Sequence, residues 1–337
     1  MTPQSAPAPD ALVAVVTPVY NGGKHLEEAI LAVQAQTYRP LVHCIVDNAS
    51  TDETADILAK YANADVPIIT RRNDTTISFQ ENHNAVLELM PPETKYFRML
   101  HADDTMPPDA IAAMMQVARS ADDIVMLSGA ERLNGVDRPH RIPPEASVFD
   151  AANMIARMLV DEAHLPCAQT MFRIDAIREG EPFYPVETVE CLIEAQLRVL
   201  SRGGRAGFVH TYNGDTRRYE GSGSLIKTLA PRVKAVIWEK LRFIEQYGPA
   251  ALSNTEYKMV KRRFLRVFYR RLLWWMVSGR GDIVRRDVAR LRERGLAPSL
   301  WGYFSAVAIW PYYLWNKRFA KPFAPLRWPD DAVKAGG

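Results

Sequence analysis

The stretch Leu12–Thr17, LVAVVT, decides the fold class, because it is short, apolar and rich in β-branched residues. A run of this kind predicts a strand that is buried on both faces. Pro18 and the cluster Asn21–Gly23 are expected to end the strand, and the apolar spacing of Leu26–Gln36 then predicts a helix.

Strand and helix patterns continue to alternate as far as about residue 130. The further predicted strands are Val42–Val46, Val66–Thr70, Tyr96–Leu100 and Asp123–Leu127, and the further predicted helices are Glu53–Tyr61, Phe79–Leu89 and Pro107–Arg119. Alternation at this spacing predicts right-handed βαβ units, and therefore an α/β fold with a mainly parallel sheet flanked by helices.

The composition is that of a folded chain. The 337 residues are 47% hydrophobic and 24% charged, which excludes a wholly disordered, collagen-like or disulfide-framework protein. Cys44, Cys167 and Cys191 show no CxxC spacing, so we expect reduced thiols and a cytoplasmic protein. Residues 1–11 lack the basic and apolar regions of a signal peptide and are expected to form a disordered lead.

The charge distribution divides the chain into two parts. Up to Leu225 the chain has 19 basic and 31 acidic residues, whereas after Leu225 it has 23 basic and 8 acidic residues. All seven tryptophans also lie after Leu225. We therefore expect the acidic part to bind a cation or a polar ligand, and the basic, tryptophan-rich part to meet an anionic surface.

Polar clusters stand at the ends of three predicted strands, namely Thr17–Asn21, Asp47–Ser50 and His101–Asp104. Ligands of parallel sheets bind at the carboxyl ends of the strands. The adjacent carboxylates of Asp103 and Asp104 are hard oxygen ligands that suit Mg²⁺ or Mn²⁺. The alternative is that one of them caps the helix that follows.

Asp47 also stands at a predicted strand end. Its carboxylate can accept the imide N–H of uracil or a hydroxyl of ribose. The alternative is that it only closes an Asx-turn.

Four short motifs occur in order along this part of the chain. They are TPVYN (Thr17–Asn21), QTYRP (Gln36–Pro40), VDNASTDET (Val46–Thr54) and HADDTMPP (His101–Pro108). Their order, spacing and strand-end positions resemble those of the family 2 glycosyltransferases of GT-A fold. The resemblance is strong over about residues 12–130 and weaker to about 225, and it implies a GT-A type, Rossmann-like sheet.

The resemblance implies a site for a nucleotide-sugar donor. The donor-binding residues that it implies are Thr17, Pro18, Tyr20, Asp47, Asn84 and Asp103. Asp103 stands at the usual metal-ligand position, with Asp104 beside it, and the implied cofactor is Mn²⁺ or Mg²⁺. His101 replaces the first acid of the family's Asp-x-Asp-Asp pattern. A neutral imidazole there could approach the ribose or Mn²⁺, or it could only hydrogen-bond the strand end.

The catalytic base is expected after the segment Phe183–Pro185. Inverting transfer needs a carboxylate that takes the proton of the acceptor hydroxyl. Glu187, Glu190 and Glu194 would share one face of a helix predicted over Val186–Arg198. We expect Glu190 to be the base, in the slot where the family usually has a Glu-Asp pair, with Glu187 and Glu194 as alternatives. A solvated acidic stripe is the other interpretation.

The segment Thr216–Ser222, TRRYEGS, resembles the family's Arg-Arg-His-x-x-Ser loop. Arg218 is the expected contact to the donor diphosphate, because an arginine on a Gly/Ser-rich hinge can close over phosphates. A basic surface loop is the alternative.

The last third of the chain has the pattern of an interfacial segment. Lys258–Val277 places basic residues opposite an apolar helical face with Phe264, Phe268, Leu272 and Trp275. Leu296–Trp315 is apolar but interrupted by proline, which argues against a membrane-crossing helix. We expect residues 258–318 to contact an anionic membrane, with a packed helical domain as the alternative; no nucleic-acid motif is present.

Together these patterns predict residues 12–225 as a GT-A catalytic domain, with a nucleotide-binding half to about 130 and an acceptor half over 131–225. Residues 226–337 are predicted to form a helical, basic, tryptophan-rich extension. The expected function is inverting transfer from a nucleotide-diphosphate sugar, most simply a UDP-sugar, to a hydroxyl of a glycan or lipid-linked acceptor in bacterial cell-surface polysaccharide synthesis. The expected location is the inner face of the cytoplasmic membrane. A nucleotidyltransferase acting on a sugar phosphate and a non-catalytic nucleotide-sugar-binding scaffold are the alternatives.

Overall fold

The computed structural model describes residues 10–140, 142–159, 165–166, 169–217, 229–308 and 311. The strands are β1 Val13–Val19, β2 Leu41–Asp47, β3 Ile68–Arg72, β4 Tyr96–Met99, β5 Ile124–Leu133, β6 Val136–Asp137, β7 Val148–Asp150, β8 Met171–Arg173 and β9 Arg205–Thr216. The helices are α1 Leu26–Gln34, α2 Thr54–Lys60, α3 Phe79–Ala85, α4 Ala110–Ala118, α5 Ala151–Leu159, α6 Cys191–Ser201, α7 Leu229–Ala251, α8 Asn254–Val277, α9 Gly281–Glu293 and α10 Leu300–Ala308, with short 3₁₀ turns η1 Val86–Leu89 and η3 Ile174–Ala176.

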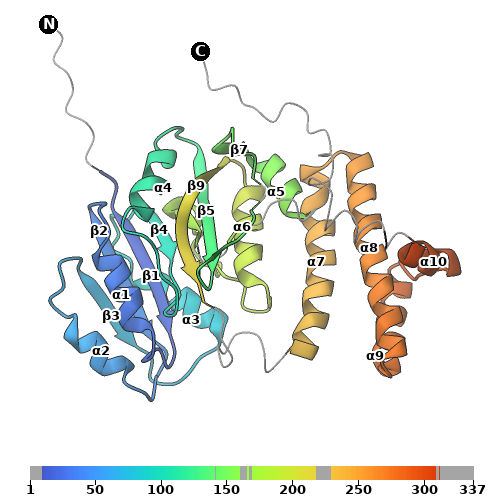
Figure 1. Cartoon of the computed structure of the whole chain (residues 1–337), viewed down its shortest axis with the longest axis horizontal. Coiled ribbons are helices and arrows are strands. Elements are labelled where there is room, and N and C mark those ends of the chain that lie inside the picture. The colour runs from blue at the N-terminus through green and yellow to red at the C-terminus, as the bar shows by residue number, and fades with distance from the viewer. Residues whose placement is uncertain are drawn as a thin grey trace, which may run out of the picture. The chain divides into compact units, whose positions relative to one another are not determined.

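The strands form one mixed sheet in the order β3-β2-β1-β4-β8-β5-β9-β7, with β6 paired to β5 (Figure 1). The pairs β1–β2, β1–β4, β2–β3 and β5–β9 are parallel, and β8 is antiparallel to both of its neighbours. The α/β fold with a mainly parallel, helix-flanked sheet, predicted from the alternation of strands and helices, is therefore confirmed.

Helices cover both faces of the sheet. On one face, Val13 and Val15 of β1 share an apolar core with residues of α1 and α4. Ile45 of β2 packs toward α1 on that face, whereas the thiol of Cys44, the preceding residue, contacts the carbonyl of Leu89 in η1. Successive residues of a strand point to opposite faces, so η1 lies on the face opposite α1.

The prediction that Pro18 ends the first strand is wrong. Pro18 lies inside β1 and pairs in register with Val46 of β2. The Val16 carbonyl accepts a hydrogen bond from the Leu100 N–H, so the backbone groups of Val16 face β4. Residues two apart in a strand have the same orientation, so the backbone nitrogen of Pro18 also faces the β4 side. Since β4 has already ended at Met99, no strand partner requires the N–H that proline lacks.

The described residues divide into two compact units, one over residues 10–232 and one over residues 233–311. In the second unit, the apolar face predicted for Lys258–Val277 packs in a core. Its members from α7, α8 and α9 are Trp238, Leu241, Phe268, Leu272, Trp275, Ile283, Val284 and Leu291. Trp274 and Trp301 are exposed, while Trp310, Trp315 and Trp328 lie outside the described residues.

Of the helices in the described part of the chain, none has the length and apolarity needed to cross a membrane.

Candidate active site

Three polar loops and the end of β9 meet at one edge of the sheet. The parallel strands β2, β1 and β4 are neighbours in the sheet, with β1 in the middle, and all three end at this edge. The loops that follow them therefore lie side by side. Two successive antiparallel pairings, β4–β8 and β8–β5, make β5 parallel to β4, and β9 is parallel to β5. The carboxyl end of β9 therefore reaches the same edge, where ligands of parallel sheets bind.

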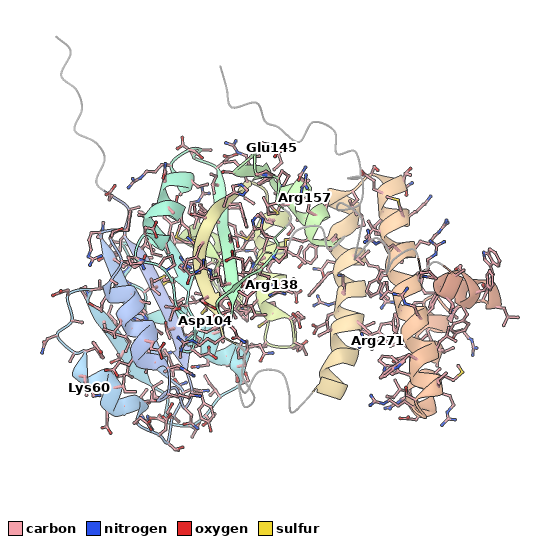
Figure 2. All side chains as sticks on the ribbon, viewed as in Figure 1. Lys60, Asp104, Arg138, Glu145, Arg157 and Arg271 are labelled. Atoms are coloured by element: carbon pink, nitrogen blue, oxygen red, sulfur yellow. The ribbon has the colours of Figure 1, made fainter. Side chains whose placement is uncertain are left out.

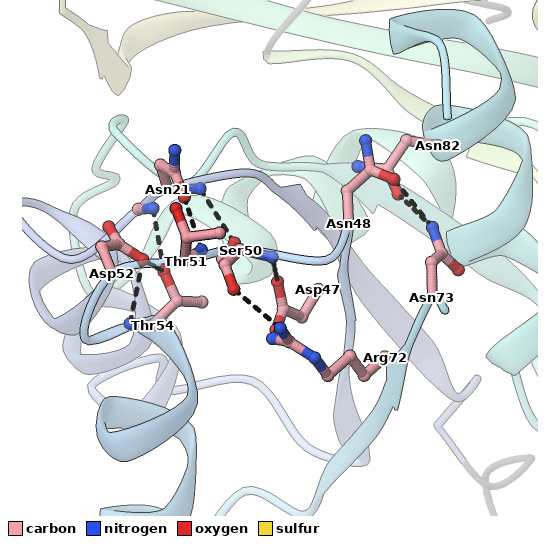
Figure 3. Close-up of polar contacts among 11 residues, drawn as sticks. Asn21, Asp47, Asn48, Ser50, Thr51, Asp52, Thr54, Arg72, Asn73 and Asn82 are labelled. Atoms are coloured by element: carbon pink, nitrogen blue, oxygen red, sulfur yellow. Dashed lines mark hydrogen bonds and ion pairs between the residues drawn. The ribbon is translucent and has the colours of Figure 1, made fainter. Parts of the chain in front are cut away.

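The loops after β1 and β2 are tied together by hydrogen bonds (Figure 3). The Asn21 N–H donates to Ser50 Oγ at 2.9 Å, and the Thr51 N–H donates to Asn21 Oδ1 at 2.9 Å. Gly23 N donates to Asp52 Oδ2 at 2.8 Å. Asn21 has a positive φ of 51°, a conformation that asparagine tolerates better than most residues. These bonds fix both loops at the sheet edge.

Asp47 is held at the end of β2 and is only 2% exposed. Its Oδ1 accepts from the Ser50 N–H at 2.9 Å, and its Oδ2 forms an ion pair with Arg72 Nη1. Arg72 Nη2 also donates to the Ser50 carbonyl at 2.7 Å (Figure 3). Arg72 was not predicted as a site residue, because the third strand was expected to end at Thr70. In the structure β3 continues to Arg72, in register with Asp47.

The residues of the TPVYN motif are placed in three different environments. Thr17 is fully buried, with its Oγ1 2.9 Å from Nε2 of His43. Pro18 is buried within β1. Tyr20 follows the strand and is 54% exposed, so its ring is open to a ligand.

Asp104 is almost completely buried in the loop after β4. Its Oδ1 accepts from the Arg217 N–H at 2.9 Å. Its Oδ2 lies 3.4 Å from His101 Nδ1 and has no partner with hydrogen-bond geometry among the described residues. The residue that precedes α4 is Asp109, so the alternative in which Asp103 or Asp104 caps that helix is wrong.

Asp103 is partly buried beside Asp104. Burial raises the pKa of the Asp103 carboxyl, because it disfavours the anion, and repulsion from the Asp104 carboxylate raises it further. A cation at this position would relieve that repulsion.

His101 contacts protein groups through both ring nitrogens. Nδ1 faces Asp104, and Nε2 lies 3.2 Å from Nε2 of His83. Burial alone would lower the pKa of His101, but the carboxylates of Asp104 and Asp103 outweigh it and the pKa is raised. Burial lowers the pKa of His83 to about 3, so His83 is the neutral partner. His83 Nδ1 lies 2.7 Å from the Phe79 carbonyl, which leaves its Nε2 to accept from His101.

The carboxylates after β4 fit a hard divalent cation that takes its other ligands from a substrate. No group of three or more His, Cys, Asp or Glu residues in the described ranges could hold a metal by itself. Magnesium-type sites often use one or two carboxylates together with substrate phosphates. Asp104 Oδ2, which makes no contact of hydrogen-bond geometry among the described residues and lies 3.4 Å from His101 Nδ1, and the adjacent Asp103 suit such a site.

Arg217 is a site residue that the sequence analysis passed over in favour of Arg218, which lies outside the described residues. Arg217 directly follows β9. Its Nη1 donates to His25 Nδ1 at 2.8 Å, and its Nη2 forms an ion pair with Glu28 of α1. The parallel pairing of β9, which no local pattern reveals, brings Arg217 to Asp104.

Asn84 connects α3 to the segment that precedes the expected base. Its Nδ2 donates to the carbonyls of Gln80 at 2.9 Å and Tyr184 at 2.7 Å, and its Oδ1 accepts from the Tyr184 N–H at 2.9 Å. Both amide hydrogens are therefore used within the protein. Gln80 Nε2 makes a further bond of 2.9 Å to the Thr188 carbonyl.

The three glutamates considered as the base do not share one helical face, so that prediction is wrong. A turn from Pro185 to Thr188 delays the helix, and α6 begins only at Cys191. Glu187 is exposed before the helix and Glu190 is half-buried at its N-cap. Glu194 is buried and accepts from Thr188 Oγ1 at 2.5 Å.

Comparisons with known proteins agree with the fold. The profile of the family described as Glycosyl transferase family 2 matches residues 14–180. The abequosyltransferase RfbV of Salmonella typhimurium is 29% identical over 136 residues, which cover 39% of this chain and 40% of that relative. The chain thus matches less than half the length of this curated relative.

Two solved structures are similar in fold. The structure of S. aureus TarS 1–349 in complex with UDP-GlcNAc has a TM-score of 0.60 at 16% identity, covering 76% of this chain and 72% of that chain. The mannosyltransferase PcManGT from Pyrobaculum calidifontis, in complex with GDP-Man and Mn²⁺, has a TM-score of 0.52 at 15% identity, covering 90% and 83%. With its strand-end loops and the family match over residues 14–180, the chain belongs to glycosyl transferase family 2 and has a GT-A type fold.

Proposed function

We propose that the protein is an inverting glycosyltransferase that uses a nucleotide-diphosphate sugar, most simply a UDP-sugar, and a divalent cation. The proposal rests above all on one observation. Asp47 is the last residue of β2 and the pair Asp103–Asp104 follows β4, so the two strands on either side of β1 place these acids at one edge of the sheet. A base-binding carboxylate and a metal-binding pair at that edge suit the two ends of a nucleotide diphosphate.

The nucleotide is assigned to the loops after β1 and β2. The exposed ring of Tyr20 would lie against the base. Asp47 would accept the base imide N–H, since a carboxylate has about four acceptor sites and the bonds to Ser50 and Arg72 leave some of them available. Thr17 and Pro18 would support the base-binding side of the site from within β1.

Asn84 is assigned to the boundary between the donor and the acceptor.

The diphosphate is assigned to the loop after β4. Asp103, with Asp104, would hold Mn²⁺ or Mg²⁺, and the bound ion would offset the charge that develops on the diphosphate leaving group. We do not assign His101 to the metal in this proposal, because both of its ring nitrogens face protein groups. Arg217, which directly follows β9, and Arg218, the next residue in the sequence, are the cations proposed to contact the phosphates.

Glu190 is the proposed general base. It would take the proton from an acceptor hydroxyl as that oxygen bonds to the anomeric carbon and the bond to the diphosphate oxygen breaks. Its half-buried place at the N-cap of α6 favours it over Glu187, which is exposed, and over Glu194, whose carboxylate is buried against Thr188.

The acceptor is proposed to be a glycan or a lipid-linked glycan in bacterial cell-surface polysaccharide synthesis, at the inner face of the cytoplasmic membrane. The names of the similar proteins support this class, because they include an abequosyltransferase and proteins solved with UDP-GlcNAc and with GDP-Man and Mn²⁺. Within 258–318, the basic residues of α8 and the exposed aromatic residues Trp274, Trp301 and Phe304 support a peripheral contact with anionic lipid.

The test is nucleotide release from a panel of nucleotide sugars with and without Mn²⁺. The proposal expects release that needs the metal and that Asp103→Asn reduces by at least ~10²-fold. Asp65→Asn, an exposed acid in the same unit, serves as the matched control and should have no effect. Pyrophosphate-dependent turnover would instead indicate a nucleotidyltransferase, and donor binding without turnover a scaffold; either result would overturn the proposal.

A further inference from the structure

The second unit exposes an apolar helix face that its own core does not use. Helix α10, LWGYFSAVA, contains no charged residue. Four of its side chains are strongly exposed: Leu300 at 91%, Trp301 at 72%, Phe304 at 60% and Val307 at 46%. Positions spaced three and four residues apart lie on one side of a helix, so these side chains form a single face.

The opposite side of α10 is anchored on α8, and Figure 1 shows the two helices side by side. The Tyr303 and Tyr269 rings lie 6.1 Å apart, and Ala306 is fully buried. Tyr269 also donates from its hydroxyl to the Leu296 carbonyl at 2.8 Å, just before α10. The exposed face is therefore presented by a helix held in place. Its Trp301 and Phe304 rings stack, with centroids 5.2 Å apart.

A row of cations runs along α8 beside the α10 contact. Lys258, Arg262 and Arg266 are spaced four residues apart, which aligns them along one side of the helix. Arg266 lies three residues before Tyr269 in α8, so the two side chains are neighbours on one side of this helix, and Tyr269 contacts α10. Between Tyr257 and the end of α8 the sequence contains no acid. In the described part of the chain, none of these three cations has an ion-pair partner within 4.0 Å.

We propose that the exposed face of α10 and the cation row of α8 together form the surface by which the protein binds an anionic phospholipid bilayer. Tryptophan and phenylalanine insert at the headgroup level, and each nearby Lys or Arg adds attraction to anionic lipid. This inference rests on the proposed function, because it identifies the membrane contact of a transferase with a lipid-linked acceptor.

The experiment is co-sedimentation of the full chain with vesicles of phosphatidylcholine alone and of phosphatidylcholine with phosphatidylglycerol, without nucleotide. We expect binding to the anionic vesicles that weakens as salt is raised. The double variant Trp301→Ser/Phe304→Ser should bind at least ~10-fold more weakly. The double variant Arg262→Glu/Arg266→Glu should lose ~10-fold or more and most of the salt dependence.

Matched controls lie in the other unit. Val136→Ser removes an exposed apolar side chain, and Lys60→Glu/Lys95→Glu makes the same change in net charge as the arginine variant; Figure 2 labels Lys60 at the end of α2. Both controls should bind like the wild type. Circular dichroism of each variant confirms that it is folded.

Unchanged binding of the Trp301/Phe304 variant would overturn the proposal, as would equal binding to neutral vesicles. If the wild type does not sediment but is a dimer that the Trp301/Phe304 variant dissociates, the face covers a second copy and the proposal fails. Nucleotide release without vesicles is measured separately, so binding without turnover contradicts only the proposed function, and turnover without binding contradicts only this inference.

Discussion

Replacement of Asn84 by alanine should destabilise the first unit, which contains the candidate active site, by about 3 kcal/mol. The side chain makes three hydrogen bonds, two of them to the backbone of Tyr184, which is 100 residues away in the sequence. A hydrogen bond contributes ~1 kcal/mol net, and the loss is larger where a buried partner is left unpaired. For a unit of this size, ~3 kcal/mol corresponds to a fall in melting temperature of roughly 6–12 °C.

The assay can separate the two units of the chain. Every tryptophan lies at or after Trp238 in the sequence, and those that the structure describes lie in the second unit, so tryptophan fluorescence reports on that unit. Differential scanning calorimetry and far-ultraviolet circular dichroism report on both units. We expect Asn84→Ala to lower the midpoint temperature of a calorimetric transition. The midpoint of the transition followed by tryptophan fluorescence should stay at its wild-type value. Asn63→Ala, at an exposed asparagine, is the matched control.

The same variant should affect turnover more than donor affinity. Asn84 holds Tyr184, and the segment after Tyr184 leads directly to Glu190 at the N-cap of α6. Loss of this support should misplace the proposed base and lower kcat, with a smaller change in the KM for the nucleotide sugar. A shift in melting temperature below about 2 °C would refute the reasoning, as would an equal shift of the tryptophan transition.

Three other perturbations test separate parts of the site. Burial lowers the pKa of His43 to about 3, so the unfolded chain takes up a proton near pH 6.5 and the folded chain does not. The free energy of unfolding should therefore fall by ~2 kcal/mol between pH 7 and pH 5 because of His43. His43→Gln should remove this part of the pH dependence, as measured by urea unfolding followed by circular dichroism. Arg72→Ala should weaken UDP binding by about tenfold in calorimetry without changing its dependence on Mn²⁺, because it removes a partner of the buried Asp47. Glu190→Gln should keep donor binding and lower transfer by at least ~10²-fold.

Each of these predictions has an internal control. A His43→Gln protein whose stability falls as steeply toward pH 5 as the wild type would contradict the first. Arg71→Ala, which changes the neighbouring residue of β3, should leave UDP affinity unchanged, and an equal loss there would contradict the second. The third is wrong if Glu187→Gln or Glu194→Gln abolishes transfer and Glu190→Gln does not.

Local patterns in the sequence were sufficient to predict the alternating strands and helices up to about residue 130. The apolar, β-branched runs predicted strands, and the polar residues just after them predicted which sheet edge carries the site. Burial and strand propensity act over a few neighbouring residues, so a short window of sequence contains this information. Helical spacing is also a local pattern, so the sequence predicted that Phe268, Leu272 and Trp275 share one apolar helical face.

Element ends were harder to predict, because pairing across the sheet decides them. Pro18 stays in β1 since β4 has ended before its N–H would be needed, and β3 runs on to Arg72 opposite Asp47. The turn from Pro185 to Thr188 moved the start of α6 to Cys191 and separated three glutamates that a continuous helix would have aligned.

The sequence by itself determined the fold class, the family motifs and the strand-end acids, because each depends on residues close together in the chain. Only the tertiary structure decided their partners. Arg217 reaches Asp104 across 113 residues, and Asn84 reaches Tyr184 across 100. Such contacts depend on which strands and loops the folded sheet places side by side, and no local pattern of residues encodes that choice.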